Sequence, residues 1–148
     1  MGNNAMRAKV MLIDDDKVTV TVLSAFLRKE GFEVVARTEA IGSAAAIVSE
    51  KPDIVVMDID MPALKGDRIV SIVGDRPELK SVGFILHSSM PIKKLHEVRN
   101  SCQANGIAHK DGGHRGLLAE VDRVLKLLGT DRSRPSTRMD TTFPDNVS

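Results

Sequence analysis

The chain has 148 residues, a formal net charge of +1, and 42% hydrophobic against 28% charged residues, a composition typical of one globular domain. The small net charge and the lack of a dense Lys/Arg run argue against direct binding to nucleic acid. Its single cysteine, Cys102, cannot form an internal disulfide. We find neither a secretory signal nor an apolar run of membrane-spanning length, so we expect a cytoplasmic protein without membrane contact.

Five short segments rich in branched apolar residues are too brief for helices and predict strands. In chain order they are KVMLI (9–13), FEVVA (32–36), DIVVM (53–57), GFILH (83–87) and GIAHK (106–110). Their apolar character is continuous rather than alternating, which is typical of parallel strands that are covered on both faces.

Helical spacing lies between these strands. A first helix is expected to begin near Lys17, with Asp16 as its N-cap, and to end before Gly31. Its expected apolar face consists of Val18, Val22, Ala25, Phe26 and Lys29. Further helices are predicted over 40–49, 67–73, 92–103 and 113–128. The last of these has a core-facing stripe of Leu117, Val121, Val124, Leu125 and Leu128.

Alternation of five strands with five helices predicts a doubly wound α/β domain over residues 6–129, with one parallel sheet covered by helices on both faces. Residues 130–148 are polar and aperiodic, and they predict a flexible tail. The alternative for this tail is a docking peptide anchored by Phe143.

Chemically capable side chains follow four of the predicted strands. They are Asp14, Asp15 and Asp16 after the first, Asp58 and Asp60 after the third, Ser88 and Ser89 at the fourth, and Lys110 at the fifth. Because the carboxyl ends of parallel strands form the usual site of open α/β sheets, we expect one shared site. Carboxylates suit Mg²⁺, a hydroxyl and a lysine suit phosphoryl oxygens, and an aspartate can itself accept a phosphoryl group. Neighbouring acids repel one another, and a divalent cation would relieve that repulsion.

The segments VMLIDDD, PDIVVMDIDMPALKG, ILHSS and ANGIAHK together resemble the response-regulator receiver domain of two-component signalling. The resemblance implies a flavodoxin-like sheet with strand order 2-1-3-4-5. It implies that Asp58 accepts a phosphoryl group from a sensor histidine kinase or phosphotransfer protein. It also implies that Asp14, Asp15, Asp58 and the backbone carbonyl of Asp60 bind Mg²⁺, that Ser88 is the switch hydroxyl, and that Lys110 pairs with the phosphate.

The chain departs from the pattern of this family at several positions. Asp111 stands where a proline usually follows the lysine, so we expect a loop of different shape. Ile107 replaces the usual aromatic residue, so switching is expected to involve Ser88 and the segment after it. Asp60 and Met90 occupy the two variable positions that influence dephosphorylation in the family.

Three functions are compatible with these residues. The first is a phosphoacceptor module, not a classical enzyme, that signals to a downstream protein target. The second is a degenerate receiver that acts as a constitutive scaffold, which the changes at Ile107 and Asp111 favour and the intact acids and Lys110 oppose. The third is a phosphatase of the haloacid-dehalogenase type, with Asp58 as nucleophile and Asp60 as general acid. Its nucleophile should follow the first strand of the chain, so this is the weakest of the three.

Overall fold

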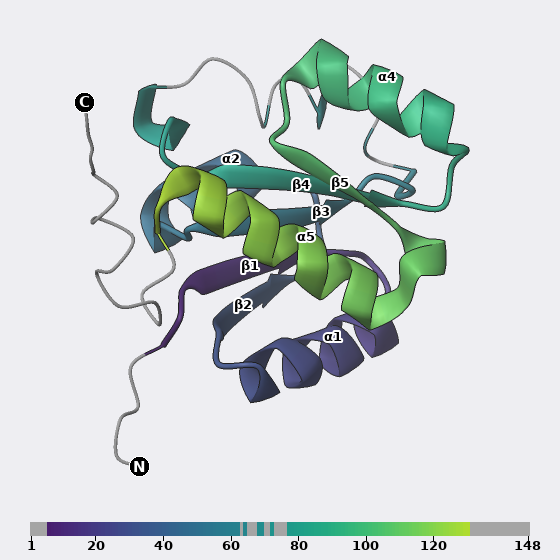
Figure 1. The fold of residues 1–148 in the computed structure, drawn as a ribbon. Helices are drawn as coiled ribbons and strands as arrows, with labels where there is room; N and C mark the ends of the chain where they lie inside the picture. Colours follow the sequence, from purple (N-terminus) through teal and green to yellow (C-terminus); the bar gives the residue numbers. More distant parts are fainter. Residues whose placement is uncertain (1–5, 63, 65–67, 70–71, 73–76, 131–148) are drawn as a thin grey trace, which may run out of the picture.

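A computed structural model describes residues 6–62, 64, 68–69, 72 and 77–130 of the chain. Its centre is a five-stranded parallel sheet with the order β2-β1-β3-β4-β5 (Figure 1), which confirms the predicted fold. The strands are β1 (Lys9–Ile13), β2 (Glu33–Arg37), β3 (Ile54–Asp58), β4 (Gly83–Ser88) and β5 (Gly106–His109). Each lies within one residue of its predicted bounds. Because β5 ends at His109, Lys110 is not a strand residue but begins the short 3-10 turn η2 (Lys110–Gly112).

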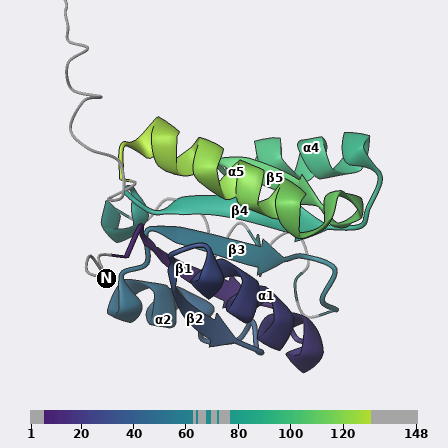
Figure 2. The ribbon, with the colours of Figure 1, turned by 60° about the horizontal axis from the view of Figure 1, so that its bottom comes forward.

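Helices cover both faces of the sheet, which explains the continuous apolar runs of its strands. The helices are α1 (Lys17–Lys29), α2 (Ser43–Glu50), α4 (Ile92–Cys102) and α5 (Gly113–Leu128), and a 3-10 turn, η1, spans Pro77–Leu79. In β1, Val10 and Leu12 pack with the side chains of α1 and α5. Met11 and Ile13 pack on the opposite face with those of α2 and α4. Figure 2 shows the sheet between these elements.

The buried face of α1 differs from the expected one. Val18 and Val22 are 71% and 46% exposed, whereas the helix buries Val20, Leu23, Ser24 and Leu27. The buried residues follow the i, i+3, i+4, i+7 spacing of one helical face. Both faces carry apolar residues, and only the packing of α1 against the sheet and α5 decides which face is buried.

Helix termini follow local chemistry. The Asp16 side chain accepts hydrogen bonds from the backbone N–H groups of Val18 and Thr19, at 3.0 and 3.4 Å, which confirms the predicted N-cap. Gly31 follows α1 with a φ of 100°. The second helix begins at Ser43 rather than residue 40, because Gly42 takes a left-handed φ of 83° immediately before it.

The helix expected over 67–73 lies largely outside the described residues, although Arg68, Ile69 and Ile72 are helical. The α5 helix has the predicted bounds and buries the predicted stripe, with Leu128 partly buried against it. The proposed tail also lies outside the described residues, apart from Thr130. In the described part of the chain, each helix is too short or too polar to cross a membrane.

Candidate functional site

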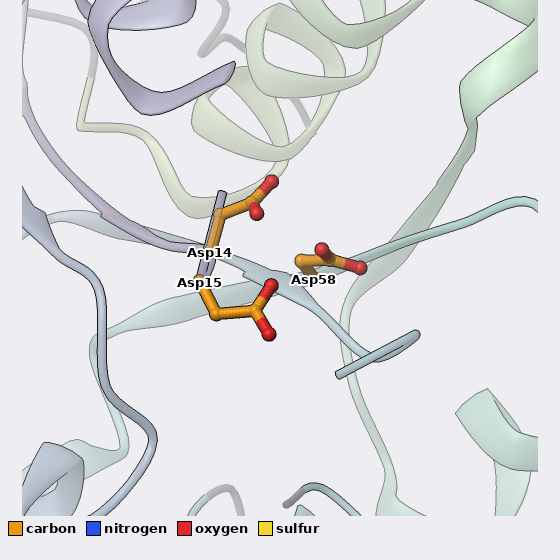
Figure 3. A group of neighbouring side chains, drawn as sticks. All are labelled: Asp14, Asp15 and Asp58. Carbon is orange, nitrogen blue, oxygen red and sulfur yellow. The ribbon is translucent and has the colours of Figure 1, made fainter. Parts of the chain in front are cut away.

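Three carboxylates converge where β1 and β3 end. Asp14 and Asp15 follow β1, and Asp58 is the last residue of β3. One ligand oxygen from each of the three lies within 4.8 Å of the others, and Figure 3 shows the carboxylates around a common space. The structure therefore brings together three of the residues that the sequence predicts for the metal site.

Local hydrogen bonds orient this acidic cluster of Asp14, Asp15 and Asp58. The backbone N–H of Asp16 donates to Asp14 Oδ1 at 2.9 Å, and the backbone N–H of Asp60 donates to Asp58 Oδ1 at 2.9 Å. In both cases a strand-end carboxylate accepts from the amide two residues later, which is a local turn that Asp favours. The turn that follows each strand therefore fixes the position of the Asp14 or Asp58 carboxylate.

The charge of the cluster is only partly balanced. Asp14 is 4% exposed, and its burial, assisted by the neighbouring charge of Asp58, raises the pKa of Asp14 from 3.8 to about 6. Carboxylate oxygens at this spacing match the oxygen ligands that Mg²⁺ prefers, and a divalent cation would favour the ionised form of all three acids. The donor set therefore fits Mg²⁺.

Lys110 connects the cluster with Asp60. Its Nζ lies 3.1 Å from Asp58 Oδ1 and 3.0 Å from Asp60 Oδ2. Burial alone would lower the pKa of Lys110, but its contacts with Asp60 and Asp58 outweigh burial and raise that pKa. The described residues contain no cis peptide bond, so a trans bond leads from Lys110 into η2. The lysine is charged and reaches the carboxylate without the proline that usually follows it in the family.

The Asp60 side chain lies beside Ser88 rather than in the acidic cluster. The Ser88 hydroxyl donates to Asp60 Oδ1 at 2.6 Å. Partial burial would raise the pKa of Asp60, but hydrogen bonds from Ser88, Ser89 and Lys110 together hold it well below its usual range. The Asp60 carboxyl is therefore ionised at neutral pH and carries no proton for general acid catalysis, which argues against the phosphatase alternative.

Two residues at the site had no specific role assigned from the sequence: Ser89, which was expected at the strand end, and His87. The backbone N–H and the hydroxyl of Ser89 both donate to Asp60 Oδ2, at 3.0 and 2.9 Å. His87, the register partner of Asp58 in β4, is 7% exposed, and burial and the charge of Lys110 lower its pKa, which favours the neutral imidazole. The sequence HSS at the end of β4 was the available signal for these two residues. It could not predict their contacts, because those contacts depend on how β4 pairs with β3.

The side chains of Ile107 and Met90 belong to the apolar packing beside the site. Both are partly buried and pack against the core cluster on the α2 and α4 side of the sheet. The backbone N–H of Ile107 donates to Glu120 Oε2 at 3.0 Å, and the backbone N–H of Met90 donates to Ser88 Oγ at 2.9 Å. Met90 is thus connected directly to the predicted switch hydroxyl, whereas Ile107 is held by α5.

Among curated proteins, the chain is similar to protein PilG of Pseudomonas aeruginosa, with 32% identity over 81 residues that cover 55% of this chain and 60% of PilG. It is also similar to the transcription factor SKN7 of Saccharomyces cerevisiae, with 32% identity over 140 residues that cover 89% of this chain and 22% of SKN7. The chain thus spans 60% or less of the length of these two relatives.

Solved structures agree with the fold. The chemotaxis response regulator CheY4 of Vibrio cholerae matches with a TM-score of 0.72 at 21% identity, covering 81% of this chain and all of CheY4. A response regulator from Desulfuromonas acetoxidans matches with a TM-score of 0.70 at 23% identity, covering 81% of this chain and 98% of that one. Residues 10–122 match the response regulator receiver domain family. The chain therefore belongs to this family of two-component signalling modules, which are not classical enzymes.

Proposed function

We propose that this receiver domain accepts a phosphoryl group on Asp58 from the phosphohistidine of a sensor kinase or phosphotransfer protein, in a reaction that requires Mg²⁺. The observation that carries the proposal is the joint position of Asp58 in the acidic cluster and 3.1 Å from Lys110 Nζ. An aspartate with only a structural role at a strand end would not require two further carboxylates and a lysine beside it. Their combination matches what phosphoryl transfer to a carboxylate requires.

The proposed reaction is a direct displacement. A carboxylate oxygen of Asp58 forms a bond to phosphorus, the bond between phosphorus and the donor imidazole nitrogen breaks, and its electron pair stays on that nitrogen. Asp14, Asp15, Asp58 and the backbone carbonyl of Asp60 would hold Mg²⁺, which supplies neutralisation of charge on the transferred group. Lys110 would bind a phosphoryl oxygen through its ammonium group, and Ser88 would donate to another.

The proposed output is a contact with a downstream protein rather than with DNA. The composition supports this, because the net charge is +1 and nucleic-acid binding usually needs a basic surface. A cytoplasmic location is part of the same proposal. It is supported by the buried thiol of Cys102, the single cysteine of the chain, which is compatible with a reducing compartment.

The test is incubation with a small-molecule phosphodonor and Mg²⁺, followed by measurement of the intact mass. We expect one base-labile phosphoryl group on the wild type, and none on Asp58→Asn or after chelation of Mg²⁺. Asp53→Asn is the matched control, because Asp53 precedes the same strand at its opposite end and accepts the backbone N–H of Lys9 at 2.8 Å. It should be phosphorylated like the wild type. Equal modification of Asp58→Asn would refute the assignment of the acceptor.

The constitutive scaffold remains the alternative, and measurement of partner binding with and without the phosphodonor separates the two. A scaffold would bind its partner equally with and without the phosphodonor. A phosphoacceptor would change its partner affinity only when Asp58 is modified. The structure supports the phosphoacceptor more strongly, because a degenerate receiver would not need to keep Asp14, Asp15, Asp58 and Lys110 together.

A further inference from the structure

The carboxylate of Asp60 accepts contacts from four donor groups. Ser88 Oγ lies 2.6 Å from its Oδ1. The backbone N and Oγ of Ser89 lie 3.0 and 2.9 Å from its Oδ2, and Lys110 Nζ lies 3.0 Å from the same oxygen. This side chain, 28% exposed, therefore engages two hydroxyls, a backbone amide and an ammonium group at the edge of the site.

These donors are the ones that a phosphoryl group on Asp58 would need. Such a group carries close to two negative charges and three strong acceptor oxygens. Lys110 is shared between Asp58 and Asp60, at 3.1 and 3.0 Å, so donors around Asp60 lie next to the acceptor. Asp60 and a phosphoryl group on Asp58 are close enough to accept from the same donors. Whether they can do so at the same time depends on how many protons each donor has.

Ser88 has no proton to spare. A hydroxyl has one proton, and Ser88 Oγ donates it to Asp60 while accepting the backbone N–H of Met90 at 2.9 Å. Ser88 is fully buried, so water does not compete for this hydroxyl. To donate to a phosphoryl oxygen, Ser88 must release Asp60. The negative charge of Asp60 would also repel a phosphoryl group placed beside it.

We propose that Asp60 is a positioning residue whose carboxylate substitutes for the phosphoryl group in the unmodified protein. It holds Ser88, Ser89 and Lys110 in place, and phosphorylation of Asp58 transfers these donors from Asp60 to the phosphoryl oxygens. This inference rests on the proposed function. It predicts that Asp60 orders the segment from Ser88 to Met90 before phosphorylation and weakens binding of the phosphoryl group.

The experiment compares the wild type, Asp60→Ala and Asp60→Asn, with Asp111→Ala as the control. Asp111 lies at the same edge of the sheet, its side chain is 92% exposed, and its removal changes the net charge by the same amount. In the first measurement no phosphodonor is present, and amide hydrogen exchange is followed at Ser89 and Met90. We expect several-fold faster exchange in Asp60→Ala, a smaller change in Asp60→Asn because its amide oxygen still accepts, and no change in Asp111→Ala.

The second measurement is titration with beryllofluoride, a phosphoryl mimic, in the presence of Mg²⁺. Asp60→Ala should bind the mimic about tenfold more tightly than the wild type, Asp60→Asn should be intermediate, and Asp111→Ala should match the wild type. Thermal unfolding of each variant verifies that it is folded.

Unchanged exchange in Asp60→Ala, or weaker binding of the mimic to it, would overturn the inference. Faster exchange in Asp60→Ala, combined with no binding of the mimic to any of the four proteins, would support the positioning of the donors by Asp60 and would overturn the proposed function instead. The two proposals therefore fail in different ways.

Discussion

Replacement of Asp14 by asparagine should stabilise the metal-free protein. Asp14 is 4% exposed, and its pKa is raised from 3.8 to about 6. A folded-state pKa above the unfolded value means that the folded protein binds this proton more tightly. The stability associated with Asp14 is therefore present below the unfolded pKa and is lost as the pH rises from about 4 to about 6.

The difference of about two pKa units corresponds to about 3 kcal/mol as an upper limit at pH values above both pKa values. Asparagine keeps an oxygen that can accept the backbone N–H of Asp16, now 2.9 Å from Asp14 Oδ1, and removes the charge. We therefore expect Asp14→Asn to raise the free energy of unfolding by about 1 to 3 kcal/mol at about pH 7.5. The gain should shrink to about 1 kcal/mol or less at about pH 4.5.

Urea unfolding in the presence of a chelator measures both values. Asp15→Asn is the control, because it removes a charge from the same cluster at an exposed position, and it should change stability by about 0.5 kcal/mol or less. Addition of Mg²⁺ should stabilise the wild type more than Asp14→Asn. A loss of stability in Asp14→Asn that is equal at both pH values would refute the reasoning.

Three further predictions concern Mg²⁺ affinity, the role of Lys110 in switching, and packing at Gly83. Asp14 must lose its proton to bind a cation, so Mg²⁺ should bind more weakly at low pH. The Kd for Mg²⁺ from calorimetric titration should be about tenfold larger at about pH 5 than at about pH 7.5. Equal Kd values would exclude Asp14 as a ligand. Lys110→Ala should keep the stabilisation by Mg²⁺ but lose the change in amide exchange at residues 88–91 on addition of beryllofluoride, and a retained change would make Lys110 dispensable for switching. Gly83→Ala should lower the free energy of unfolding by about 1 to 3 kcal/mol, measured in urea. The new Cβ would lie 2.7 to 2.9 Å from side-chain atoms of Val124, Ile54 and Leu128, so unchanged stability would mean that this part of the core can rearrange.

Much of the fold could be predicted because its signals are local. The apolar runs of the five strands and the stripe of α5 reflect burial that repeats along one element. Caps such as Asp16 depend on hydrogen bonds to residues two or three positions away. The acids at the ends of β1 and β3 could be assigned to one site for a similar reason, since all strands of a parallel sheet end at the same edge.

The contact partners of individual side chains could be determined only from the tertiary structure. Both faces of α1 carry apolar residues, and contact with the sheet and α5 buries the one with Leu23 and Leu27. The Asp60 side chain meets Ser88 and Ser89 only because β3 and β4 pair with Asp58 opposite His87, which brings together residues 28 and 29 positions apart in the chain. The sequence by itself determined that acids, hydroxyls and a lysine share one edge. Only the packed sheet determined that Asp60 accepts from Ser88, Ser89 and Lys110. A hydrogen bond requires a donor–acceptor distance correct to within a few tenths of an ångström, which spacing along the chain does not specify.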